Sequence, residues 1–247
     1  MNPEIYTATQ GLVARQYQLD ITAQNIANAN TAGYRGTNSF FYAYNDAMNA
    51  GHQNVLNSMA NNQPILTGTF ISSETGPIKH TGGAYDLALE GPGFFKLKTP
   101  FGTRYTRRGH FRLNAEGALT NEQGYYVLDN RNRRILLDET PLEVSQDGFL
   151  YQNGIEKGQI SVVELTNPEN LVPEEDVLIA STDPNQVELP ARARIARGFL
   201  ESSNVNIAKE MVSLIRAQRA YEMNNDVIKT IDRDLNQKMI QTFGSIK

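Results

Sequence analysis

The first thirty residues carry apolar positions at the spacing of one narrow helical stripe. The stripe residues lie seven apart: Ile5, Leu12, Leu19 and Ile26. A seven-residue spacing keeps side chains on one face of a helix. Pro3 suits a first turn, and Gly33 can supply a left-handed stop, so we predict a helix from Pro3 to about Asn30. A stripe this narrow is typical of a seam between long helices.

The last forty residues repeat this pattern over a greater length. A second apolar series lies seven apart: Ile207, Leu214, Tyr221, Ile228 and Leu235. The positions four residues later turn polar in the middle: Met211, Gln218, Asn225, Asp232 and Met239. We predict a helix from Ile207 to Thr242, roughly 50 Å long at ~1.5 Å per residue. That length exceeds what a compact domain of this size usually needs.

Between these helices the pattern changes to period two, with frequent turns. Residues 38–80 are rich in Asn, Thr, Ser and Gly, and from Thr81 to Pro190 short strands alternate with turn residues. We predict an α+β fold, in which long N- and C-terminal helices pair as a coiled-coil-like core around an inserted, mainly antiparallel β domain. The expected parts are 1–34 (first helix), 35–80 (extended connector), 81–190 (β domain) and 191–247 (return segment and last helix).

Composition narrows the function classes. The formal net charge of −4 and the pI of about 5.5 give no general attraction to nucleic acid or anionic lipid. The absence of cysteine excludes disulfides and thiolate metal sites. The N-terminus shows no basic segment followed by an apolar run, and no stretch reaches ~18 apolar residues. Alone, these features predict a cytoplasmic protein without a membrane span.

We find no catalytic or metal-binding constellation. His52, His80 and His110 lie far apart in segments of different character. The Gly91–Gly93 segment joins two strands, whereas a phosphate-binding loop leads into a helix, so a β-turn is the better interpretation. We therefore predict no catalytic residues, no metal, no cofactor and no enzymatic activity.

Arginines form three groups, at 104–112, 131–134 and 192–197. Interleaved aromatics allow a nucleic-acid face, but the acidic composition favours a solvated strand face. Pairing with carboxylates of a neighbouring subunit is a third interpretation.

Asparagines at the end of the first helix leave two interpretations open. Asn25, Asn28 and Asn30 either end the helix or fix the register between packed helices. The predicted subunit-interface residues are Ile5, Leu12, Leu19, Asn25, Ile26, Asn28, Ile207, Met211, Leu214, Gln218, Tyr221, Ile228 and Leu235. In the predicted main seam, Leu214, Tyr221 and Ile228 face Leu12, Leu19 and Ile26.

Three segments in order along the chain resemble the flagellar rod and hook family of axial proteins. They are 19–34 (LDITAQNIANANTAGY), 86–120 (beginning DLALEGPGFF and continuing with YTRRGHF) and 198–222 (GFLESSNVN, then EMV and QRAYE). Arg108 and His110 depart from the family pattern, and we therefore transfer no family property to the turn that contains them. The short connector and the Met-Asn-Pro-Glu-Ile-Tyr opening are most similar to a proximal rod subunit.

The resemblance implies a structural subunit of the bacterial flagellar basal body. Such proteins are exported by the flagellar type III system, polymerise helically beneath an assembly cap, transmit torque and line the export channel with their terminal helices. The rod crosses the periplasm, which replaces the cytoplasmic prediction. Implied partners are copies of the chain, other rod and hook axial proteins, the export apparatus and cap, and bushing rings or peptidoglycan, but not nucleic acid and not a membrane interior. The alternatives are a distal rod or hook-type subunit, and a coiled-coil-dimerised glycan-binding module.

Overall fold

The computed structural model describes residues 3–43, 64–167, 170–174, 177–183 and 186–244. Its contacts divide the chain into two compact units. Unit 1 comprises Met1–Ile26, Ser39–Gly68 and Ile207–Lys247, and unit 2 comprises Ala27–Asn38 and Thr69–Asn206. This division differs from the predicted parts, because Ala27–Asn38 and residues 191–206 belong to unit 2, whereas Ser39–Gly68 belongs to unit 1 with the two helices.

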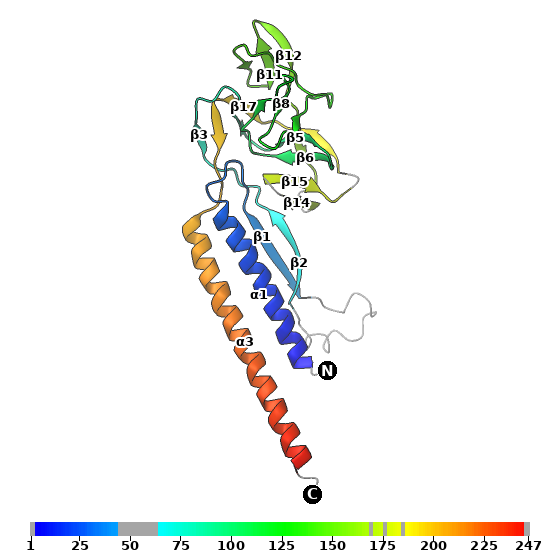
Figure 1. The fold of residues 1–247 in the computed structure, drawn as a ribbon, viewed down its shortest axis with the longest axis vertical. Helices are drawn as coiled ribbons and strands as arrows, with labels where there is room; N and C mark the ends of the chain where they lie inside the picture. Colours follow the sequence, from blue (N-terminus) through cyan, green and yellow to red (C-terminus); the bar gives the residue numbers. More distant parts are fainter. Residues whose placement is uncertain (1–2, 44–63, 168–169, 175–176, 184–185, 245–247) are drawn as a thin grey trace. The chain divides into compact units, whose positions relative to one another are not determined.

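Unit 1 contains two long helices that pack together, α1 (Pro3–Ala27) and α3 (Ile207–Gly244). They lie side by side in Figure 1. At Gly11 of α1 a Cβ atom would lie only 3.3 Å from Asn224 Nδ2 of α3, so a residue without a side chain permits the close approach. The predicted α+β class with paired terminal helices is confirmed.

The start of α3 was predicted at the correct residue, whereas the end of α1 was placed about three residues too late. α1 ends at Ala27, because the next residues form a turn in which the Thr31 N–H donates to Asn28 O (3.0 Å). The Thr31 hydroxyl also contacts Asn28 Oδ1 (3.3 Å). Gly33 follows at φ 70°, in the left-handed region that favours glycine.

The expected connector contains strands β1 (Thr37–Ala43), β2 (Pro64–Ile71) and β3 (Ile78–His80). β1 and β2 pair with each other, and β3 pairs antiparallel with β18 (Phe199–Glu201). Residues 44–63 of the connector lie outside the described residues.

The largest sheet of unit 2 is antiparallel and runs in the order β14-β15-β6-β5-β9-β8-β7, with β13 added beside β5 and β16 beside β13. Its strands are β5 (Phe94–Thr99), β6 (Gly102–Thr106), β7 (Arg112–Leu113), β8 (Leu119–Thr120), β9 (Tyr126–Val127), β13 (Val162–Leu165), β14 (Leu171–Pro173), β15 (Leu178–Ser181) and β16 (Glu188–Pro190). The tight β5–β6 hairpin fixes the register Phe95↔Thr106 to Thr99↔Gly102.

Two smaller sheets complete the described part of unit 2. β10 (Glu143–Val144), β11 (Phe149–Gln152) and β12 (Ile155–Gln159) form an antiparallel meander. β4 (Leu87–Glu90) pairs with β17 (Arg194–Arg197). The return segment therefore supplies β17 and β18, which the sequence analysis did not predict as strands.

The main core of unit 2 lies among these sheets. Leu87, Leu89, Phe95, Leu97 and Phe111 are all at most 3 % exposed, and the Phe95 and Phe111 rings meet edge-on at 5.2 Å. Gly109 belongs to the same core, because a Cβ there would lie 1.6 Å from Leu87 O. Within the described residues, neither helix has the length and apolar character needed to cross a membrane.

Candidate assembly interface

The buried row of α1 differs from the predicted stripe. It follows alternating spacings of three and four: Gly11, Ala14, Gln18, Ile21 and Asn25, with Ala14, Ile21 and Asn25 buried. Gly11, Gln18 and Asn25 of this row each lie one position before a member of the predicted stripe, and the stripe members Leu12, Leu19 and Ile26 are half-buried. One position corresponds to about 100° around a helix, so the two rows lie on different faces of α1. The buried row consists mainly of small and polar residues, so a pattern of large apolar side chains did not predict it.

On α3 the row with the same spacing contains Leu214, Ala217, Tyr221, Asn224, Ile228 and Ile231, all buried or half-buried. The contact between Gly11 and Asn224 joins this row to the Gly11 row of α1. Within one chain, α3 thus approaches the small-residue side of α1, which leaves the pairing of Leu214, Tyr221 and Ile228 with the leucine stripe a prediction.

The remaining predicted interface residues fall into three groups. Asn28 is half-buried in the turn that ends α1, and Asn25 is 3 % exposed. Ile207, Met211 and Gln218 are exposed. The side chains of Ile5 and Leu235 lie outside the described residues.

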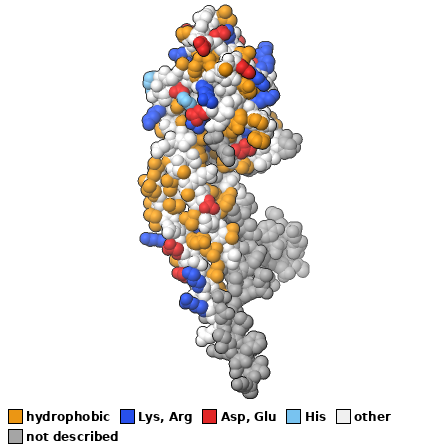
Figure 2. Space-filling view, in the orientation of Figure 1, with side chains coloured by type: hydrophobic (Ala, Val, Ile, Leu, Met, Phe, Trp, Pro, Cys, Tyr) orange, Lys and Arg blue, Asp and Glu red, His pale blue; other side chains and the backbone are white. Residues whose placement is uncertain are grey.

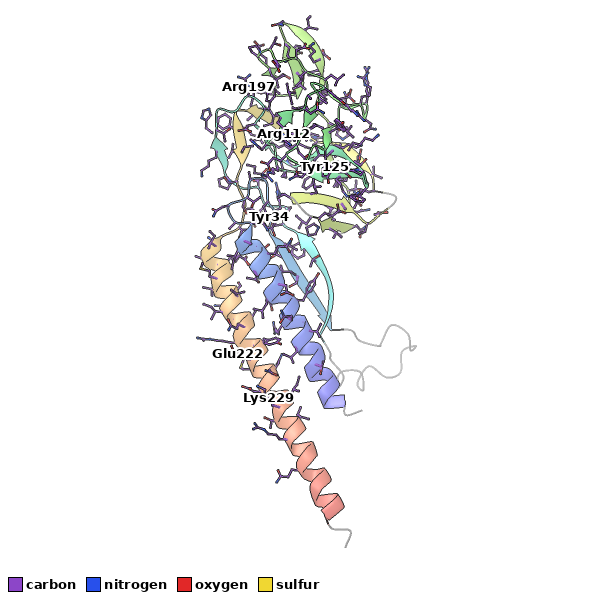
Figure 3. The ribbon with its side chains drawn as sticks, viewed as in Figure 1. Tyr34, Arg112, Tyr125, Arg197, Glu222 and Lys229 are labelled. Atoms are coloured by element: carbon purple, nitrogen blue, oxygen red, sulfur yellow. The ribbon has the colours of Figure 1, made fainter. Side chains whose placement is uncertain are left out.

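Four exposed apolar residues cluster on the first turns of α3. We call Ile207, Met211, Val212 and Ile215 the α3 apolar patch; three of them are about half exposed, and Ile207 is 38 % exposed. Isolated exposed apolar residues are ordinary, but a continuous row marks an interaction surface. Figure 2 shows hydrophobic side chains on the visible face of the helices. Further along α3, charged residues such as Glu222 and Lys229 are exposed (Figure 3).

Unit 2 contains a buried arginine–glutamate cluster that sequence reasoning missed. Glu201 Oε1 lies 3.1 Å from Arg35 Nη2, and Glu201 Oε2 lies 3.5 Å from Arg107 Nη1. All three side chains are at most 4 % exposed. The Gly76 N–H also donates to Glu201 Oε1 (3.0 Å). One carboxylate therefore compensates two guanidinium groups.

Close backbone crossings hold this cluster in place. The Gly33 N–H donates to Glu201 O (2.7 Å), and a Cβ on Gly33 would lie 2.3 Å from Arg108 N. A Cβ on Gly76 would lie 1.9 Å from Ser202 O. Glycine is thus required where these segments meet, and the cluster ties together residues distant in sequence.

Burial is the main influence on the charges in this cluster. Burial lowers the pKa of Arg107 to about 10, with the Glu201 carboxylate acting in the opposite direction and Arg35 lowering it further. Burial also lowers the pKa of Arg35, again opposed by Glu201. Both guanidinium groups remain protonated at neutral pH, so the cluster acts as a fixed structural ion pair.

Two other arginines of the first group are partly exposed and paired with carboxylates, whereas the exposed Arg112 donates to Glu122 O (2.6 Å). Arg104 Nε lies 2.6 Å from Glu174 Oε2, and Arg108 Nη2 lies 2.6 Å from Glu122 Oε2. The prediction of a solvated face was wrong for Arg107, because the charge of Glu201 permits its burial. Pairing with a neighbouring subunit remains a prediction for the other arginines.

The histidines occupy separate environments. His110 Nδ1 lies 2.6 Å from Asp86 Oδ1, His80 packs edge-on against Phe199, and His52 lies outside the described residues. Across the part of the chain that the structure describes, no three His, Cys, Asp or Glu residues gather in a way that could hold a metal ion.

Three sequence families match the chain in order. Residues 5–35 match the family described as flagella basal body rod protein. Residues 88–162 match the D1 domain of the flagellar hook protein FlgE/F/G, and residues 196–242 match the C-terminal part of the flagellar basal body rod FlgEFG protein. The first and last matches cover most of α1 and most of α3, and the middle match lies in unit 2.

Similar proteins extend over the whole chain. The flagellar basal-body rod protein FlgF of Caulobacter vibrioides is 33 % identical over 255 residues, covering 100 % of both chains. The flagellar basal-body rod protein FlgG of Borreliella burgdorferi is 34 % identical over 258 residues, covering 94 % of this chain and 95 % of its own. FlgF of Mesorhizobium japonicum is 33 % identical over 248 residues, covering 99 % of each. The chain therefore belongs to the family of flagellar basal-body rod proteins, which is structural and not enzymatic.

Proposed function

We propose that this protein is a proximal subunit of the flagellar rod that polymerises helically through α1 and α3. The observation that carries the proposal is the α3 apolar patch, which one chain leaves exposed at the start of a 38-residue helix. Burial of apolar surface is the main favourable term in association. Stacked copies would cover the patch with helices of neighbouring subunits.

A helical polymer needs a contact between two different surfaces of the same chain, because only such a contact repeats without closing. The α3 apolar patch is one candidate surface. The half-buried leucine stripe of α1 is a second, since it lies away from the row that approaches α3 in one chain. This arrangement supports an inner wall made of α1 and α3 from successive subunits.

The partners in this proposal are copies of the chain and other rod and hook axial proteins. Travel through the flagellar export apparatus, growth beneath a cap, and contact with bushing rings or peptidoglycan follow from the same assignment. The three similar proteins described above are named FlgF and FlgG, which supports a place among the rod subunits.

A charge placed in the patch tests the proposal. Met211→Glu with Ile215→Glu should leave the monomer as structured as wild type, because both side chains are about half exposed, but should prevent rod formation and motility. Leu136→Glu is the matched control, since Leu136 is 59 % exposed in unit 2. Normal rods and swimming in the double variant, with circular dichroism equal to wild type, would overturn the role of the patch.

The free monomer offers a separate test. Isolated helices with narrow apolar stripes are marginal in water, so we expect the first ~30 and last ~40 residues to exchange their amide hydrogens rapidly before assembly. Strong protection of both ends in purified monomer would contradict folding coupled to assembly.

A further inference from the structure

Unit 2 contains a cavity of about 370 Å³. None of the residues that line it belongs to α1 or α3. Its polar lining includes Lys96, Asn130, Asn132, Asp147, Ser161 and Glu188, and we call it the Lys96 pocket. The volume lies at the lower end of the ~300–1,000 Å³ typical of ligand sites. Such a pocket suits a small ligand or one unit of a longer chain.

The positive charge of the pocket is already compensated. Lys96 Nζ lies 2.5 Å from Glu188 Oε2, and the Tyr105 hydroxyl donates to Glu188 Oε1 (2.7 Å). These contacts hold the carboxylate of Glu188 in one position and raise the pKa of Tyr105, to which burial contributes most. With Lys96 paired and Asp147 adding a further negative charge, the pocket disfavours anions.

An amide network forms another part of the lining. The Asn130 amide donates to Gln159 Oε1 (2.8 Å), and the Gln159 amide donates to Asp147 O (2.9 Å). Asn132 and Asp147 are exposed, and their side chains make no hydrogen bond with any other described residue. Asn132 sits at φ 59°, a backbone region that asparagine tolerates better than most residues. The pocket thus presents donors and acceptors that have no partner in the described chain.

The rest of the lining is apolar. Ile160, Val162 and Pro190 contribute to it, beside Ala191 and Ala193. A sugar ring has C–H groups on its faces and hydroxyls around its edge. Apolar side chains can cover such a face, while amides and carboxylates exchange hydrogen bonds with neighbouring hydroxyls.

We propose that the Lys96 pocket binds a neutral saccharide unit. The compensated lysine excludes an anionic ligand, the free amide and carboxylate suit hydroxyl groups, and the apolar lining suits a ring face. Both oxygens of Glu188 already accept hydrogen bonds from Lys96 and Tyr105, which hold this carboxylate in place in the pocket lining. This site would give the rod protein a second contact, separate from its assembly through α1 and α3.

To test the proposal, triacetylchitotriose and maltotriose are titrated separately into isotope-labelled full-length monomer. Binding is measured by the changes in NMR chemical shifts of the protein. Asn132→Gly removes the free amide and keeps the backbone conformation, because glycine tolerates positive φ. Asn153→Gly is the matched control, since Asn153 has φ 51° and is not part of the pocket lining. We expect at least one trisaccharide to bind wild type and the control equally, and Asn132→Gly to bind roughly five- to tenfold more weakly.

The two sugars show which group of the saccharide the pocket recognises. Binding of triacetylchitotriose alone would assign a role to the acetamido group, whereas binding of both would assign the hydroxyl edge; either supports the proposal. No response to either sugar at millimolar concentration would overturn it, as would equal affinities of Asn132→Gly and the control. Pocket signals that change only on polymerisation would also overturn it and assign the pocket to a neighbouring copy.

Discussion

Replacing Glu201 by glutamine tests the buried arginine–glutamate cluster. Glutamine retains the shape of the side chain and an oxygen that can still accept from the Gly76 N–H, but it removes the negative charge. Arg35 and Arg107 would then remain buried without a counter-charge. The substitution therefore isolates the charge from the hydrogen bond.

The expected effect is large because all three side chains are almost completely buried. Removing one partner of a buried ion pair typically destabilises a protein by about 3–5 kcal/mol. With a urea dependence of about 2 kcal/mol/M, this lowers the unfolding midpoint by about 2 M. Glu174→Gln removes a carboxylate from the partly exposed pair with Arg104 and should change stability by about 0–1 kcal/mol.

The chain contains no tryptophan and 11 tyrosines, so tyrosine fluorescence can follow unfolding in urea. Amide exchange at Gly76 adds a local measurement, because this N–H donates directly to Glu201. Unfolding midpoints that fall equally in Glu201→Gln and Glu174→Gln would refute the reasoning. An unchanged midpoint for Glu201→Gln would refute it as well.

Three further predictions concern separate parts of the chain. Leu214→Asp should abolish polymerisation, seen by electron microscopy, while the circular dichroism of the β strands persists; normal rods would count against the helical seam. Gly109→Ala should destabilise unit 2 by about 2 kcal/mol or more, since its Cβ would overlap Leu87 O; an unchanged melting temperature would contradict the packing. Burial tends to raise the pKa of Asp129, but the N–H groups of residues 131 and 133 and the Arg133 guanidinium outweigh it and lower the pKa. Its contribution is therefore present above the unfolded pKa of about 3.9 and lost as pH falls through the lower folded value, so Asp129→Asn should show a shallower acid loss of stability in urea titrations.

Much of the fold could be predicted from the sequence. The period-seven patterns predicted both helices, and the motifs at 19–34, 86–120 and 198–222 predicted the rod family, which the comparisons confirm. These signals are strong because helix periodicity extends over many residues. The end of α1 was predicted less accurately, because several consecutive residues between Asn28 and Gly33 are each compatible with a helix end.

Features that depend on distant residues could not be predicted. β17 and β18 form because Arg194–Arg197 and Phe199–Glu201 find partners more than a hundred residues earlier. Glu201 and Arg35 are 166 residues apart, so no local pattern signals their pair. The small-residue row of α1 was missed because Gly11 and Ala14 pack closely without being strongly hydrophobic.

The Lys96 pocket was missed for the same reason. Lys96 and Glu188 are 92 residues apart, so no local pattern in the sequence signals their pair. Only the antiparallel pairings of β5 with β13 and of β13 with β16 bring their strands together. The sequence predicted a β domain, but not the cavity in it.

Cysteine accessibility in assembled rods tests the central claim most directly. The chain has no cysteine, so Ile215→Cys introduces one reactive thiol into the α3 apolar patch. A maleimide reagent should modify it rapidly in the monomer and slowly in purified rods, whereas Leu136→Cys in unit 2 reports on general changes in reactivity. Strong protection of position 215 on assembly is the predicted result. Equal modification of that position in monomer and rods would contradict assembly through this helix face.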